Sequence, residues 1–99
     1  MKRERGEEPV ASGLVVLCLY VAGDTPQSMR ALVNARRYCE QYLKGQYELR
    51  VVDVREHPEV AQREQLIALP TLVKKFPTPE HRLIGDLADQ SKLEQRLHL

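Results

Sequence analysis

The chain has 99 residues, 42% of them hydrophobic and 29% charged, and its formal net charge is +1 at pH 7. This length fits one domain with a single core. The nearly balanced charge argues against a general electrostatic attraction to nucleic acid or to an anionic membrane. The longest apolar run, at 14–22, has nine residues. A membrane-spanning helix needs ~20, so we expect neither a nucleic-acid partner nor a membrane span.

The first 13 residues contain too little apolar surface to pack, so we expect a flexible tail at 1–13 and one folded domain at 14–99. This tail lacks the apolar segment of a secretory signal. Cys18 and Cys39 lie 21 positions apart and form no C-x-x-C motif. Their pattern favours buried thiols in a reducing, cytoplasmic compartment, although a disulfide between neighbouring elements stays open at this stage.

The first half of the chain predicts a strand, a helix and a second strand. The apolar run at 14–21 is typical of a strand buried on both faces, in the middle of a largely parallel sheet. Thr25 then caps a helix that begins at Pro26 and ends near Lys44. A strand at 47–54 completes a right-handed βαβ unit. The apolar arc of the helix is expected to comprise Met29, Leu32, Val33, Ala35, Cys39, Tyr42 and Leu43.

The second half predicts a short helix, a pair of strands and a final helix, at 58–65, 71–76, 82–85 and 89–97. Pro70 directly precedes the third strand, where a cis peptide bond would let the chain turn. The element order βαβαββα is that of an α/β thioredoxin-like fold. Thioredoxins carry two cysteines in the turn after the first strand. Here that turn reads Thr-Pro-Gln-Ser at 25–28, so the scaffold is expected without its usual redox chemistry.

Three stretches of the sequence form a recognisable family pattern. The first is Leu17-x-Leu19-Tyr20-Val21-Ala22-Gly23-x-Thr25-Pro26-x-Ser28-x-Arg30-Ala31-Leu32. The second is Gly45-x-Tyr47-x-Leu49-x-Val51-x-Asp53-Val54, followed by Pro58. The third combines Pro70-Thr71-Leu72, Pro77-x-Pro79 and Arg82-x-Ile84-Gly85-Asp86-Leu87. With these stretches the chain resembles the KaiB family of bacterial clock proteins, without a gap over about residues 14–93.

The resemblance implies a non-enzymatic adaptor that binds a KaiC-type ATPase ring and modulates its phosphorylation or ATPase cycle. It also implies a metamorphic protein whose C-terminal half has an alternative resting fold. Pro70, Pro77 and Pro79 are then candidates for a fold switch, because X-Pro bonds isomerise slowly. Self-association as a dimer or tetramer and contact with a kinase that has a KaiB-like domain are further expectations.

The same resemblance implies partner-binding roles for Arg30 and Arg82. For Arg30 the plainer interpretation is a solvated position on a helix face, since exposed charges contribute little. A lysine that the family uses before Pro70 is Gln65 here. Arg96 stands where relatives often have glycine, and the chain stops at residue 99, where relatives continue. These two departures favour the thioredoxin-like form as the resident one.

No catalytic residue, cofactor or metal site is expected, because the three histidines lack metal-ligand spacing and no glycine-rich phosphate loop occurs. Two alternatives stay open. One is a thiol-dependent oxidoreductase that uses Cys18 or Cys39 in an unusual place. The other is a stress or signalling module with a KaiB-like domain and no part in a rhythm.

Overall fold

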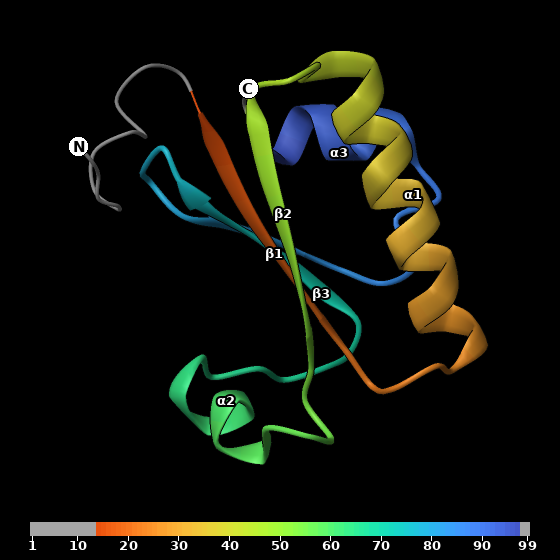
Figure 1. Ribbon diagram of the computed structural model, residues 1–99, viewed down its shortest axis with the longest axis vertical. Coiled ribbons are helices and arrows are strands. Elements are labelled where there is room, and N and C mark those ends of the chain that lie inside the picture. Colours follow the sequence, from red (N-terminus) through yellow and green to blue (C-terminus); the bar gives the residue numbers. More distant parts are fainter. Residues whose placement is uncertain (1–13, 98–99) are drawn as a thin grey trace.

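The computed structural model describes residues 14–97; the tail expected at 1–13 and the last two positions lie outside them. Within the described range, the order of elements is βαβαββα, as the sequence predicts (Figure 1). None of these helices is long and apolar enough to cross a membrane. The elements are β1 (Val15–Val21), α1 (Pro26–Tyr42), β2 (Tyr47–Asp53), α2 (Pro58–Arg63), β3 (Thr71–Phe76), β4 (His81–Ile84) and α3 (Gln90–Leu97).

The strands form one mixed sheet in the order β2-β1-β3-β4. Every residue of β1 is buried, which confirms its central place. The expectation of a largely parallel sheet was wrong, because only the β1–β2 pair is parallel. A helical crossover joins β1 to β2 and keeps their directions the same, whereas the short β3–β4 connection makes a hairpin and therefore reverses the chain.

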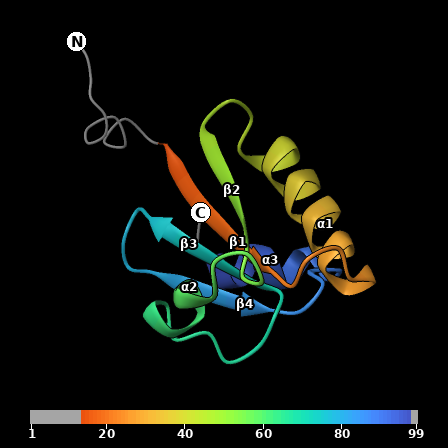
Figure 2. The same ribbon diagram turned by 60° about the horizontal axis from the view of Figure 1, so that its bottom comes forward.

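The two faces of the sheet are covered unequally (Figures 1 and 2). The long helix α1 and the C-terminal α3 pack on one face, and the short α2 packs on the other. Alternate residues of β1 therefore enter two separate cores: Leu17 and Leu19 lie under α1 and α3, while Cys18 and Tyr20 lie on the α2 side. This arrangement leaves the outward face of α1 without a covering element.

The helix ends differ slightly from those expected. Thr25 caps α1, with its side-chain oxygen accepting a hydrogen bond from the backbone N–H of Ser28 at 3.3 Å. The helix stops at Tyr42 rather than at Lys44, because Leu43 leaves the helical conformation. Likewise α2 ends before Gln65, which has a φ of 55°.

The three prolines singled out in the sequence all follow cis peptide bonds. Pro70 is buried before β3, and its carbonyl accepts a hydrogen bond from the backbone N–H of Gly85 at 3.0 Å. Pro77 and Pro79 are exposed in the β3–β4 connection. Their role in a fold switch stays a prediction.

Two neighbouring lysines of β3 lie in opposite electrostatic environments. Lys74 is 2% exposed, and its amine makes no hydrogen bond or ion pair within residues 14–97. Burial lowers the pKa of Lys74, since desolvation disfavours the charged amine. Lys75 points to the other face, where its Nζ lies 2.5 Å from Oε1 of Glu64. We therefore expect the two amines to affect stability in opposite directions.

We predict that Lys74→Met raises the free energy of unfolding at pH 7, because it removes a charge that burial of the side chain disfavours and that no ion pair within residues 14–97 offsets. A gain of ~1 kcal/mol would raise the Tm by about 4–8 °C in a domain of this size. The pKa of Lys74 is lower in the folded chain than in the unfolded chain, where it is 10.5. The free energy of unfolding of the wild type should therefore rise as the pH approaches 10.5, and the variant should not show this rise. Urea denaturation at pH 7 and pH 9.5 measures both effects.

Lys75→Met is the matched control, on the same strand with the same side-chain change. It should lower stability, because Glu64 would lose its nearest cation. Equal destabilisation by the two substitutions would contradict this account of Lys74.

Candidate protein-binding surface

The turn between β1 and α1, where thioredoxins carry their cysteines, is closed by hydrogen bonds in this chain. The N–H of Ala22 donates to Oγ of Ser28 at 3.1 Å, and the N–H of Gly23 donates to Oδ1 of Asp53 at 3.0 Å. Ser28 is 1% exposed, so its hydroxyl is a buried acceptor for the turn rather than an accessible nucleophile. This turn therefore positions the start of α1 against the end of β2.

The two cysteines are both buried and free, so the disulfide that the sequence left open is not formed. Cys18 belongs to the core on the α2 side of the sheet, whereas Cys39 belongs to the core under α1 and α3. Burial raises the pKa of Cys39 to about 12, which disfavours the reactive thiolate. The burial of both thiols lends the oxidoreductase alternative no support. Within residues 14–97, no group of three or more potential ligands could hold a metal ion.

The outward face of α1 carries apolar side chains between arginines. Met29 is 47% exposed and Val33 is 54% exposed. Together with Arg30, Asn34 and Arg37 they line a hollow of about 380 Å³. Met29, Val33 and Arg37 lie four residues apart, as do Arg30 and Asn34, so the five line one side of the helix; Asn34 is buried and the other four are exposed. We call this set the α1 surface.

The α1 surface corrects the apolar arc expected from the sequence. Three members of the expected arc, Met29, Val33 and Tyr42, are exposed rather than buried against the sheet. Ala35 and Cys39 of the expected arc are buried, and the small residues Ala31 and Ala35 face the sheet and allow the helix to approach it closely. Met29 and Val33 point outward, while the larger Tyr38 is buried. The buried row of the helix comprises Ser28, Ala31, Asn34, Ala35, Tyr38 and Cys39.

Arg30 lies at the edge of the α1 surface and is paired with an acid from a distant part of the chain. Its Nε lies 3.3 Å from Oδ2 of Asp86, in the loop after β4, and its side chain is 59% exposed. The carbonyl of Asp86 accepts a second hydrogen bond, from Nδ2 of Asn34 at 2.8 Å. These contacts tie the β4–α3 loop to the first half of α1.

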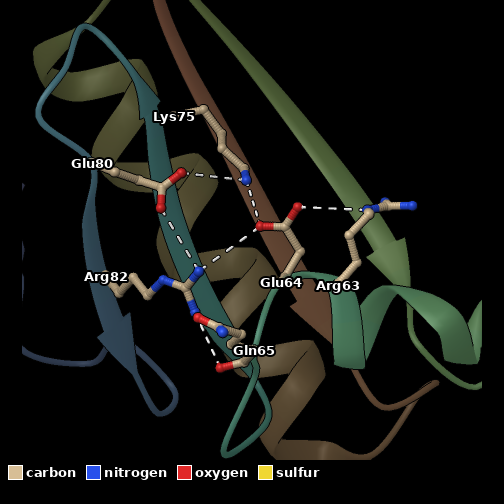
Figure 3. A network of polar contacts seen from close by, with 6 residues as sticks. All are labelled: Arg63, Glu64, Gln65, Lys75, Glu80 and Arg82. Carbon is tan, nitrogen blue, oxygen red and sulfur yellow. Dashed lines mark hydrogen bonds and ion pairs between the residues drawn. The ribbon is translucent and has the colours of Figure 1, made fainter.

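Arg82, the second predicted partner-binding residue, belongs to a charge network on the α2 side of the sheet (Figure 3). Glu64, at the end of α2, lies 2.5 Å from Nζ of Lys75 and 3.9 Å from Nη2 of Arg82. Glu80 lies 3.4 Å from the same Nζ and 3.7 Å from the same Nη2. The network thus links α2, β3 and β4. Burial alone would lower the pKa of Lys75, but the hydrogen bond to Glu64 and the two carboxylate charges raise it.

The structure does not bring Arg30 and Arg82 together. Arg30 projects from the helix on one face of the sheet, whereas Arg82 pairs with Glu64 from the helix on the other face. The charge of Arg82 is also balanced by two carboxylates, so an acidic partner would have to compete with them. Its partner-binding role stays a prediction, and the α1 surface is the stronger candidate site.

Sequence reasoning missed Asp86 and Glu64. Asp86 lies within a motif quoted for the family resemblance, but nothing local shows that its acceptor groups meet α1, 52 to 56 positions earlier. Glu64 is one of several acidic residues near α2, and its partners come from β3 and β4. Both roles depend on tertiary contacts.

Comparison with known proteins agrees with this fold. A family model described as the KaiB domain matches residues 18–99. The chain belongs to the KaiB family. Among its relatives, the circadian clock oscillator protein KaiB of Prochlorococcus marinus is 49% identical over 78 residues, which cover 79% of this chain and 74% of the relative. The KaiB protein of Gloeothece citriformis is 46% identical, with the same coverage of both chains. Membership in the KaiB family supports a clock role.

Solved structures show the same fold at low sequence identity. The N-terminal domain of Synechococcus elongatus SasA has a TM-score of 0.71 and 24% identity, covering 99% of this KaiB-family chain and 91% of that domain. Mitochondrial thioredoxin 3 of Saccharomyces cerevisiae has a TM-score of 0.69 and 17% identity, covering 91% and 83%. These likenesses confirm the thioredoxin-like fold.

We predict that Glu64→Gln lowers the free energy of unfolding by about 1–3 kcal/mol, because Lys75 and Arg82 lose their shared, mostly buried carboxylate. Urea denaturation measures this loss, and 1 M NaCl should reduce the difference between the two proteins. Glu59→Gln, at an exposed position on the same helix, is the control and should change stability by a few tenths of a kcal/mol. Equal effects of the two substitutions would contradict the network's role.

Proposed function

We propose that this chain binds a KaiC-type ATPase ring through the α1 surface and modulates the ring's phosphorylation or ATPase cycle, without catalysis of its own. The observation that carries the proposal is the exposed apolar and arginine-rich face of α1 on a KaiB-family scaffold. The turn between β1 and α1, where thioredoxins carry their reactive cysteines, also supports a role in binding rather than in thiol chemistry. There, hydrogen bonds close the turn and both cysteines are buried elsewhere.

The α1 surface has the composition of a protein-binding site. Methionine and arginine are enriched in protein interfaces, and apolar side chains at the centre of a patch supply most of the desolvation energy. Here Met29 and Val33 provide the apolar centre, while Arg30 and Arg37 provide charge beside it. A partner segment with apolar and acidic side chains complements this pattern.

We also propose a clock protein or a kinase with a KaiB-like domain as a further partner of this chain. The SasA N-terminal domain shares the fold of this chain. Self-association as a dimer or tetramer would compete with ring binding if it covered α1. We place this activity in the cytoplasm, and the fold switch implied by the family belongs to the same proposal.

We predict that Arg30→Glu weakens binding to the host's KaiC-type ATPase at least about tenfold, equivalent to ~1.4 kcal/mol. The substitution places a carboxylate opposite an acidic partner, while the side chain is largely exposed, so the domain should stay folded. Titration of the ATPase with labelled wild-type and variant protein measures the affinity, and circular dichroism checks the fold.

Arg63→Glu is the control, because Arg63 is 64% exposed and lies on α2, on the other face of the sheet. It makes the same change in net charge. A loss of affinity for Arg63→Glu with none for Arg30→Glu would move the site to the α2 side and reject the α1 surface.

A further inference from the structure

We propose that Asp86 is a positioning residue for Arg30, and that the α1 surface therefore recognises a partner carboxylate next to an aliphatic side chain. This inference rests on the proposed function and names the partner chemistry at the same site. It follows from three features of the structure: the fixed place of Asp86, the unused end of the Arg30 guanidinium, and the apolar hollow beside it.

Two hydrogen bonds hold Asp86 in place apart from its contact with Arg30. Its carbonyl accepts a hydrogen bond from Nδ2 of Asn34 at 2.8 Å, and Oδ1 accepts one from the backbone N–H of Ala88 at 3.1 Å. Asn34 is 9% exposed, so the first of these bonds is largely shielded from water. The remaining oxygen, Oδ2, is left for Arg30 at 3.3 Å. The carboxylate is thus fixed before any partner arrives.

The contact between Arg30 and Asp86 leaves part of the guanidinium free. Asp86 contacts Nε, and within residues 14–97 neither Nη atom of Arg30 donates a hydrogen bond. A guanidinium has five N–H donors in a planar fork, and its two Nη atoms can hold a carboxylate bidentately. A pairing through Nε therefore orients Arg30 without occupying its Nη end. Because the orientation is fixed in advance, less side-chain entropy is lost on binding.

The hollow adds a second requirement to the site. Met29 and Val33 are exposed within one helical turn of Arg30, so a partner carboxylate on the Nη end would lie beside apolar surface. An aliphatic side chain next to that carboxylate would cover Met29 and Val33 and exclude water from the ion pair. Arg37, one turn further on, keeps the hollow positively charged and disfavours a basic partner segment.

A double-mutant cycle tests this positioning role. Asp86→Asn keeps an oxygen for Ala88 but removes the charge that pairs with Arg30. Affinity for the KaiC-type ATPase is measured for wild type, Asp86→Asn, Arg30→Ala and the double variant. We expect Asp86→Asn to weaken binding about three- to tenfold in the wild-type background and to have almost no effect in the Arg30→Ala background.

Asp24→Asn is the matched control, because Asp24 also lies near the start of α1 but its side chain is 93% exposed. This control should bind like wild type. Equal weakening by Asp86→Asn in both backgrounds would show a merely structural role and overturn the proposal. Tighter binding by Asp86→Asn would overturn it too, since Asp86 would then compete with the partner.

A measurement on the free protein separates this inference from the proposed function. The side-chain Nε–H signal of Arg30 in a ¹H–¹⁵N NMR spectrum should exchange slowly in wild type and broaden in Asp86→Asn. If wild type fails to bind the ATPase while this difference is present, the ring-binding function fails and the positioning by Asp86 stands. An Nε–H signal that is identical in the two proteins would reject the positioning itself.

Discussion

The burial of β1 on both faces is the constraint on which the rest of the structure depends. All seven of its side chains are buried, and its backbone pairs with a strand on each side. Each face of this strand therefore needs its own cover. The long α1, with α3, covers one face, and α2 with the loop after it covers the other. The two candidate regions of the surface, the α1 surface and the charge network, lie on opposite sides for this reason.

Close packing on β1 also explains why α1 exposes apolar side chains. A helix can approach a sheet closely only where its facing residues are small, and Ala31 and Ala35 provide that row. The bulkier Met29 and Val33 are turned to the outside, beside the arginines. Exposed apolar area of this kind costs solubility in a monomer and is typical of a surface that another protein covers. The packing requirement of the core thus produces the candidate binding site.

Much of this fold could be predicted from the sequence, because local signals determine it. The apolar run of β1, the Thr25 cap with its following proline, and the bounds of β3 follow from short-range patterns. The rotation of α1 about its axis could not be predicted. The spacing of apolar residues along a helix does not distinguish small side chains from large ones. In addition, the burial of Asn34 depends on its hydrogen bond to the carbonyl of Asp86, 52 positions away.

The candidate site could be predicted only in part from the sequence, because some of its contacts join segments that are far apart in the chain. Arg30 lies on the exposed face that the sequence suggested, but its acidic partner comes from a loop after β4. The environment of Arg82 is set by Glu64 and Glu80, and tertiary contacts bring Glu64, 18 positions earlier, beside it. The charge that a surface residue offers to a partner depends on such neighbours. Resemblance can identify the residue but not how far its charge is already balanced.

Hydrogen–deuterium exchange, measured on the free chain and on the chain bound to the host's KaiC-type ATPase ring, tests the central claim most directly. The account predicts slower exchange on binding at 26–37 and 84–89, which contain the first half of α1 and the loop that holds Asp86. It predicts little change in α2 and in the β3–β4 connection. Protection confined to α2 and the β3–β4 connection, or no protection anywhere in the chain, would contradict the assignment of α1 as the binding surface.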